Sequence, residues 1–219
     1  MSNKSLVLSV LAFGLAIFAV LLYFETGPAP VAGTDPGEPK TSEALIRPYS
    51  PILGPEDAPV TIIEFFDPAC EACRAFYPVV KDILAQYPDD VRVVIRYTPF
   101  HGQSSEVAVK LMEAARMQGV YEEVMQAFMV YQDAWASRGP PNMEKIRSIA
   151  AGAGLDLDAA MTQIKSPDII AIFNQDKADV ETMGIQQTPT FFVNGKPLDP
   201  FGEAQFRKQV AAEVEAAKS

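Results

Sequence analysis

Cysteine and histidine are the scarcest reactive residues in this chain of 219 residues, which contains two cysteines and one histidine. A tetrahedral zinc site needs four Cys, His or carboxylate ligands, so this small number argues against a zinc site. The two cysteines are Cys70 and Cys73, separated by Glu71 and Ala72. Because no other thiol competes for the bond, this C-x-x-C pair is expected to close and reopen a single disulfide.

Basic residues are also few: 18 Lys and Arg stand against 28 Asp and Glu, for a formal net charge of −10. Nucleic acids and anionic lipid surfaces bind proteins through a basic face, so this balance argues against either as the main partner. Ordinary solubility accounts for the acidity itself. We therefore expect no nucleic-acid partner.

The chain has one long uncharged apolar run, residues 6–24, which lies between Lys4 and Glu25. At 1.5 Å per residue this run is long enough to span a bilayer as a helix, which predicts a single transmembrane anchor in residues 1–24. The positive charge of Lys4 favours a cytoplasmic N-terminus, with the rest of the chain outside. A cleaved signal peptide is the alternative, but the cuts available around Pro30 lack the small-x-small pattern.

Residues 25–50 are rich in Pro, Gly and small polar residues, so we expect a flexible linker there and a folded domain over residues 51–219. Outside the cytoplasm a disulfide persists, so the two cysteines are either a structural staple or a redox pair. A bond across two intervening residues closes a very short loop and removes little entropy from the unfolded chain. The spacing therefore favours a reversible redox pair.

Hydrophobic periodicity predicts a strand at residues 60–66, a helix that begins at the cysteines and contains Pro78, and a strand at residues 91–97 with Arg92 and Arg96 at its edges. A strand–helix–strand unit of this length implies parallel pairing. The pattern then predicts a series of helices, the first of which is capped by Ser104 or Ser105. It also predicts a hairpin around Asn194-Gly195. The predicted helices cover residues 104–117, 121–136, 142–151, 157–165, 168–183 and 203–217. This order indicates an α/β fold with a mixed sheet and an inserted helical subdomain at about residues 104–167.

The position of the cysteines at a helix start gives them different roles. Unpaired backbone N–H groups and the helix dipole should stabilise a thiolate at Cys70. Cys73 lies one turn further into the helix and is expected to be more buried, where it can attack a mixed disulfide formed at Cys70. Cys70 is thus the predicted nucleophile and Cys73 the resolving thiol.

Two segments of this sequence resemble one protein family. Residues 64–73 (EFFDPACEAC) are similar to the strand and active site of the DsbA-like thiol:disulfide oxidoreductases of the thioredoxin superfamily. Residues 187–195 (QTPTFFVNG) resemble the cis-proline loop and hairpin of that family. The resemblance covers about residues 51–217 and implies a thioredoxin-like fold with a helical insertion, and no cofactor.

The resemblance also implies an activity and a location. The expected function is disulfide exchange with cysteine-containing exported proteins, with a membrane redox partner that recycles the cysteine pair. The expected location is the bacterial inner membrane, with a single span and the catalytic domain facing the periplasm or the cell exterior.

Particular residues acquire roles through the same resemblance. Pro189 is implied to follow a cis bond that turns the Thr188 backbone towards Cys70, where an incoming peptide can pair. Glu64 takes the place of a buried acid that relays the proton of Cys73, although a glutamate exposed at a sheet edge is the alternative.

The dipeptide between the cysteines, Glu71-Ala72, is also expected to contact substrate. Strongly oxidising members have Pro-His at these two positions. The charge of Glu71 should raise the pKa of Cys70 and make the disulfide less oxidising. Thr188 before the proline is more typical of isomerases and reductases, so oxidation, isomerisation and reduction all stay open.

Two functions of other kinds remain open. One is a non-enzymatic binding or chaperone module on a thioredoxin-like scaffold, and the other is the delivery of electrons to a metal-centre assembly factor. The single histidine, His101, follows the second strand and either tunes Cys70 or is an ordinary residue at a helix start.

Overall fold

The computed structural model describes residues 45–136 and 140–219. The predicted membrane anchor and most of the predicted linker lie outside these residues, so both stay predictions. Within the described ranges, no helix is long and apolar enough to cross a membrane.

A five-stranded mixed sheet forms the centre of the fold, with the strand order β1-β3-β2-β4-β5. β2 (Val60–Phe66) pairs in parallel with β3 (Val91–Tyr97), as the strand–helix–strand pattern predicted. β1 (Ile52–Leu53), β4 (Thr190–Val193) and β5 (Lys196–Pro197) pair antiparallel with their neighbours. Every residue of β2 is buried, because this β-branched and aromatic strand has partners on both sides.

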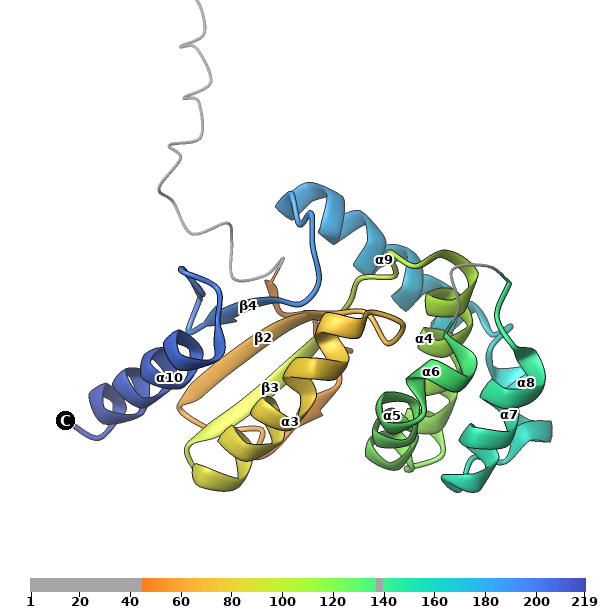
Figure 1. Cartoon of the computed structure of the whole chain (residues 1–219), viewed down its shortest axis with the longest axis horizontal. Coiled ribbons are helices and arrows are strands. Elements are labelled where there is room, and N and C mark those ends of the chain that lie inside the picture. The colour runs from red at the N-terminus through yellow and green to blue at the C-terminus, as the bar shows by residue number, and fades with distance from the viewer. Residues whose placement is uncertain (1–44, 137–139) are drawn as a thin grey trace, which may run out of the picture. The chain divides into compact units, whose positions relative to one another are not determined.

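Helices cover both faces of this sheet and extend to one side of it. They are α3 (Glu71–Gln86), α4 (Gly102–Met117), α5 (Tyr121–Val130), α6 (Gln132–Trp135), α7 (Met143–Gly152), α8 (Leu157–Gln163), α9 (Pro167–Met183) and α10 (Glu203–Ala217). Figure 1 shows α4–α8 gathered beside the sheet as a helical subdomain. This arrangement is the α/β fold with inserted helices that the sequence predicted.

Alternation along β2 separates two hydrophobic clusters. Ile62 and Phe66 face the larger cluster, to which α3 and α10 contribute, whereas Ile63 and Phe65 face a smaller one with residues of α9. Glu64 has the same parity as Ile62 and Phe66, so its side chain is on the α3 side of the sheet. The pleat thereby places Glu64 on the face that also holds the cysteines.

Two local predictions differ from the structure. The helix predicted over residues 121–136 is divided into α5 and α6 at Tyr131. The predicted caps Ser104 and Ser105 are buried inside α4, whose N-cap is His101. Ser105 still accepts a hydrogen bond from the His101 backbone N–H at 3.0 Å, from within the first turn.

The folded body extends six residues into the segment predicted as linker. Leu45 is buried, and the guanidinium of Arg47 donates two hydrogen bonds to Asp179 of α9, at 2.7 and 2.8 Å. The Tyr49 hydroxyl donates to Asp176 of the same helix at 2.9 Å. Composition alone did not predict this anchoring, because its partners are more than 120 residues away.

The predicted hairpin turn is present at Asn194 and Gly195, whose φ angles are +47° and +77°. β4 enters this turn antiparallel to β2, with Thr190 opposite Phe65. The loop before β4 therefore lies at the carboxyl end of β2, where the cysteine segment begins.

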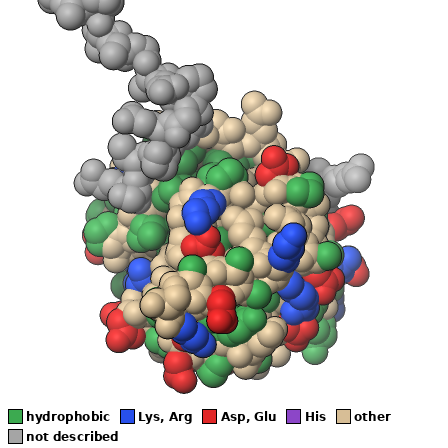
Figure 2. Space-filling view, turned by 90° about the vertical axis from the view of Figure 1, so that its left-hand side faces the viewer, with side chains coloured by type: hydrophobic (Ala, Val, Ile, Leu, Met, Phe, Trp, Pro, Cys, Tyr) green, Lys and Arg blue, Asp and Glu red, His purple; other side chains and the backbone are tan. Residues whose placement is uncertain are grey.

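The charged residues of the body do not separate by sign where Figure 2 displays them. Acidic and basic side chains are interspersed with apolar ones on the face turned to the viewer. The net negative charge is thus spread over this surface.

Candidate active site

The cysteine segment begins where β2 ends, in a turn that Asp67 organises. The Asp67 carbonyl accepts a hydrogen bond from the Cys70 N–H at 3.1 Å, and its carboxylate accepts one from Ala69 at 2.9 Å. Cys70 is the N-cap of α3, as predicted, and its own carbonyl accepts the first helical bond from Arg74 at 3.1 Å. The Cys70 sulfur therefore lies at the positive end of the helix dipole.

The two thiols are free in this structure and have opposite acidities. The pKa of Cys70 falls to about 5, chiefly because its thiolate is hydrogen-bonded by Cys73, and further because Thr188 and the first backbone N–H groups of α3 bond to it; burial opposes the shift. Burial raises the pKa of Cys73 well above its usual value, and the charges of Glu64 and Cys70 add to this effect. Cys70 is 6% exposed and Cys73 is fully buried. The pair thus has one reactive thiolate and one protonated thiol.

The expected effect of Glu71 on this thiolate is not among the main causes of the Cys70 pKa. The sequence analysis expected its charge to raise the pKa of Cys70, yet that pKa is lowered and Glu71 is not among the groups that shift it. The Glu71 side chain is exposed, where water and salt screen its charge. Hydrogen bonds from Cys73 and Thr188 are the main causes that lower the pKa of Cys70.

The loop before β4 brings the second predicted segment against the nucleophile. The Thr188–Pro189 peptide bond is cis, as the family resemblance implied. The Cys70 sulfur lies 3.3 Å from the Thr188 carbonyl oxygen, which accepts a hydrogen bond from it when the thiol is protonated. Cys70, Thr188 and Pro189 therefore form one site from segments about 118 residues apart in the sequence.

Glu64 is a buried acid below the cysteines and not a residue of an exposed sheet edge. It pairs with Ile95 on one side and Phe191 on the other, in the middle of the sheet, and is 2% exposed. Burial raises the pKa of Glu64 to about 8, and the charge of Cys70 adds to the shift. A carboxyl with this acidity can hold or release a proton near neutral pH.

Asp67 and His101 form a pair beside the nucleophile. The Asp67 carboxylate is fully buried and accepts hydrogen bonds from the backbone N–H groups of Phe100 and His101, at 2.7 and 3.1 Å. The Nδ1 atom of His101 lies 2.7 Å from the same carboxylate oxygen. This hydrogen bond is the main reason that the pKa of His101 is raised. Sequence analysis did not single out Asp67, although an Asp-Pro turn directly before a C-x-x-C was a usable signal.

Gln132 is the other residue that sequence analysis missed. It is buried on α6, and its side-chain amide donates to the carbonyl oxygens of Pro68 and Cys70, at 2.8 and 3.0 Å. Asp133, its neighbour, pairs with Arg74 of α3 at 2.6 Å. The helical subdomain thus holds the cysteine loop directly. No sequence signal pointed to Gln132, because the contact depends on the break between α5 and α6.

A cavity of about 210 Å³ opens beside Cys70, between α3, the start of α4 and α6. Its walls include both predicted dipeptide positions; they are Ala69, Cys70, Glu71, Ala72, His101, Gln132, Asp133 and Ala136. The predicted positions Glu71 and Ala72 thus line the same cavity as Cys70.

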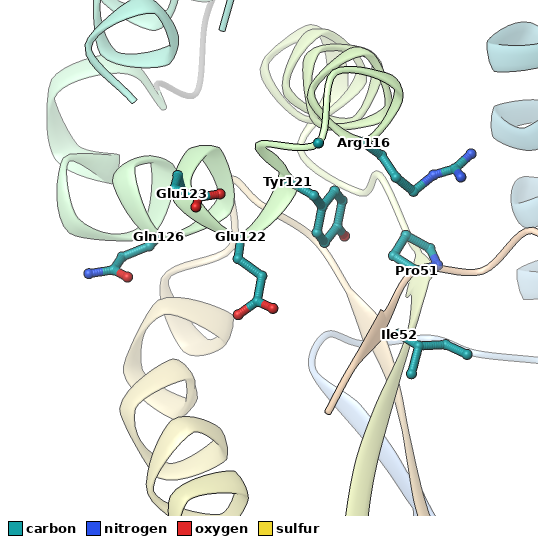
Figure 3. A pocket seen from close by; sticks show the side chains of 8 residues that line it. Pro51, Ile52, Arg116, Tyr121, Glu122, Glu123 and Gln126 are labelled. Atoms are coloured by element: carbon teal, nitrogen blue, oxygen red, sulfur yellow. The ribbon is translucent and has the colours of Figure 1, made fainter. Parts of the chain in front are cut away.

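A separate cavity of about 540 Å³ lies away from the cysteines, between the start of β1, the end of α4 and the start of α5 (Figure 3). Two of its polar side chains already have partners inside the protein. Arg116 pairs with Glu113 at 2.7 Å, and the hydroxyl groups of Tyr97 and Tyr121 are 3.2 Å apart. Neither cysteine lines this cavity, so the cavity beside Cys70 is the candidate site.

Comparison with known proteins agrees with this geometry. The family model described as "Thioredoxin" matches residues 47–212. The chain belongs to the thioredoxin family.

A thioredoxin-like oxidoreductase from Silicibacter pomeroyi is 30% identical, with a TM-score of 0.68, over 81% of this chain and 98% of that one. Within the family, the fold is that of the DsbA-like proteins. Wolbachia pipientis alpha-DsbA1 has a TM-score of 0.70 at 22% identity, over 80% of this chain and 95% of that one.

The curated relatives are much longer proteins. A relative from Herminiimonas arsenicoxydans named as the Na⁺/H⁺ antiporter NhaA is 32% identical over 167 residues, which are 76% of this chain and 25% of that protein. The chain spans between 22% and 30% of the length of such relatives. The antiporter name therefore describes proteins of which this chain matches only a part.

Proposed function

We propose that this protein is a thiol:disulfide oxidoreductase that works through Cys70 and Cys73. In the reducing direction, the Cys70 thiolate attacks a substrate disulfide, forms a mixed disulfide and expels one substrate thiolate. Cys73 then loses its proton and attacks the Cys70 sulfur, which closes the Cys70–Cys73 disulfide and releases the second substrate thiolate. Oxidation of a substrate dithiol is the same sequence reversed.

The observation that carries this proposal is the opposite acidity of two thiols one helical turn apart. The pKa of Cys70 is about 5, so this sulfur is a thiolate at neutral pH, whereas the raised pKa of the buried Cys73 keeps its proton until a mixed disulfide forms. A structural disulfide requires no such difference. Glu64, which faces the same side of the sheet, is the group we propose to accept the Cys73 proton.

The lowered pKa of Cys70 also supports a direction for the exchange, namely net oxidation of the substrate. A stabilised thiolate favours the reduced form of the pair and makes the disulfide more oxidising. A pKa of about 5 lies between those of thioredoxin, about 7, and DsbA, about 3.5. We therefore propose net oxidation of substrates, with isomerisation or reduction of particular partners as the alternative.

Substrate binding is proposed at the loop of Thr188 and Pro189. The Thr188 carbonyl lies 3.3 Å from the Cys70 sulfur, so an extended peptide that pairs with this backbone would bring its own sulfur to Cys70. Glu71 and Ala72 line the adjoining cavity. The proposed substrates are cysteine-containing exported proteins, and a membrane redox partner is proposed to recycle the pair.

The proposed location is the bacterial inner membrane, with the catalytic domain outside the cytoplasm. The uncharged run at residues 6–24 supports the anchor. Cell fractionation of the full chain should find it in the membrane, and removal of residues 1–24 should release it; a full chain that stays in the soluble fraction would contradict the anchor.

Activity and scaffold can be separated with one variant. Wild-type protein should exchange with a peptide disulfide, and Cys70→Ala should lose exchange while it still binds the reduced peptide. If the wild type shows no exchange, the enzyme proposal fails and a binding or chaperone module is favoured instead.

The Cys73→Ala variant should trap mixed disulfides in cells. Many exported proteins in the trap would support general exchange, and a single metal-centre assembly factor would support the narrower role of a reductant.

A further inference from the structure

The cavity beside Cys70 contains one ionisable ring that the exchange cycle above does not use. His101 lines this cavity together with Cys70, so a substrate sulfur bonded to Cys70 would share the space with the imidazole. The His101 side chain is 43% exposed, which leaves it open to the cavity and to solvent. Its position is thus that of a group that meets the substrate.

The buried carboxylate of Asp67 fixes the orientation of this ring. Asp67 accepts hydrogen bonds from three backbone N–H groups, at 2.7 to 3.1 Å, so its side chain is held in place. A carboxylate only accepts, so the 2.7 Å contact requires the proton on Nδ1 of His101. Nε2 has no hydrogen-bond partner in the part of the chain that the structure describes. The ring therefore has one anchored nitrogen and one available nitrogen.

Capping of α4 does not require the imidazole. His101 is the N-cap residue, but its side chain makes no capping hydrogen bond, and its backbone N–H bonds to Asp67 and Ser105. A purely structural residue at this position needs only its backbone. The contact between the ring and Asp67 is thus an additional feature of the side chain.

The charges that face His101 are mainly negative. Asp67 follows β2, Cys70 and Glu71 open α3, and Asp133 of α6 lines the same cavity but is paired with Arg74. The hydrogen bond to Asp67 raises the pKa of His101, and the charges of Cys70 and Glu71 add to this effect. Protonation of the ring near neutral pH is therefore favoured by its neighbours.

We propose that His101, oriented by Asp67, exchanges a proton with the substrate sulfur that leaves or attacks at Cys70. This proposal rests on the exchange function proposed above. When the Cys70 thiolate attacks a substrate disulfide, a new S–S bond forms at Cys70 and the old one breaks. Protonated His101 gives its Nε2 proton to the departing thiolate and becomes neutral. In the opposite direction, neutral His101 takes the proton of the attacking substrate thiol.

The test compares two leaving groups with one histidine variant. In the purified full chain carrying Cys73→Ala, reaction stops at the mixed disulfide. Glutathione disulfide expels an alkyl thiolate that gains from protonation, whereas a symmetrical nitrothiobenzoate disulfide expels an aromatic thiolate that does not. His101→Asn keeps a side-chain N–H that can bond to Asp67, but it lacks the imidazole and therefore the Nε2 atom that would give or take the proton. The thiolate absorbance of Cys70 is titrated in each protein, so that rates are compared per thiolate.

We expect His101→Asn to react with glutathione disulfide about 10 to 100 times more slowly, and with the aromatic disulfide at nearly the wild-type rate. The difference in the rate with glutathione disulfide between the protein with His101 and the His101→Asn variant should shrink as pH rises, because the ring loses its proton. Equal losses with both disulfides, or no loss with either, would overturn the role of His101. If the protein with His101 intact reacts with neither disulfide, the exchange function itself fails, and the proposal on His101 falls with it.

Discussion

At the scale of the residue, the site depends on the different surroundings that the fold gives to two identical side chains. Cys70 and Cys73 are separated by two residues, yet the pKa of the first is lowered to about 5 and that of the second is raised. The first sulfur receives hydrogen bonds at a helix start, and the second is enclosed in the core. The sequence was enough to predict this order of acidity and burial, because both depend on the helix register.

The influence of Glu71 was not predictable from the sequence, because adjacency along the chain does not determine exposure. We expect Glu71→Gln to change the pKa of Cys70 by less than about 0.5, since screening reduces an exposed charge. Thr188→Val should raise that pKa, because the Thr188 side chain stabilises the thiolate. Titration of the thiolate absorbance measures both. A larger shift in the glutamate variant than in the threonine variant would contradict this ranking.

Glu64→Gln is expected to stabilise the reduced protein at neutral pH. With a pKa of about 8 when folded and 4.5 when unfolded, Glu64 lowers stability as pH rises from 4.5 towards 8, because unfolding releases its proton. The gain in the free energy of unfolding should be on the order of 3 kcal/mol at pH 7 and close to zero at pH 4. Urea denaturation at the two pH values measures it. The same gain at both would show that Glu64 is charged in the folded state.

At the scale of the element, short connections between helices decide how the site is held. The sequence predicted the strands and most helix limits, since these depend on periodicity and on turn residues such as Asn194 and Gly195. It did not predict the division at Tyr131, where neither Gly nor Pro marks the boundary between α5 and α6. The direction of Gln132 follows from that division, so its contacts with the cysteine loop were not predictable.

Gln132→Met is expected to loosen the cysteine loop and leave the fold intact. The variant keeps a side chain of similar length but leaves the carbonyl oxygens of Pro68 and Cys70 without their side-chain donor. Stability should fall by about 1 to 3 kcal/mol, and hydrogen exchange at the first N–H groups of α3 should become faster. Gln126→Met, at an exposed position of α5, is the control and should change neither. If both variants behave alike, the contact with the loop has no particular role.

At the scale of the whole molecule, a buried ion network joins the sheet, α9 and the first described residues. Arg96 of β3 is fully buried and pairs with Asp176 and Asp179 of α9, at 2.9 and 2.5 Å. Arg47 reaches Asp179 from the N-terminal segment. The sequence analysis placed Arg96 at a strand edge; its burial is a tertiary property, because both of its partners lie about 80 residues away.

Arg96→Met should be strongly destabilising, because it leaves two buried carboxylates without their shared partner. We expect a loss of about 3 to 5 kcal/mol in the free energy of unfolding. Arg92→Met on the same strand is the control. Arg92 is partly exposed and bonds to Thr61 at 2.9 Å, so its loss should cost about 1 kcal/mol. Denaturant titration at pH 7 compares the two, and similar losses would refute a special role for the network.

The central claim for the whole molecule is that Cys70 alone supplies the reactive thiolate. The most direct measurement is the rate of alkylation of each cysteine against pH in the reduced native protein, with the modified residue identified by mass spectrometry. The account predicts that Cys70 is alkylated first, with a midpoint near pH 5, and that Cys73 reacts only after unfolding. A Cys70 midpoint near the usual thiol value, or modification of Cys73 before Cys70, would contradict it.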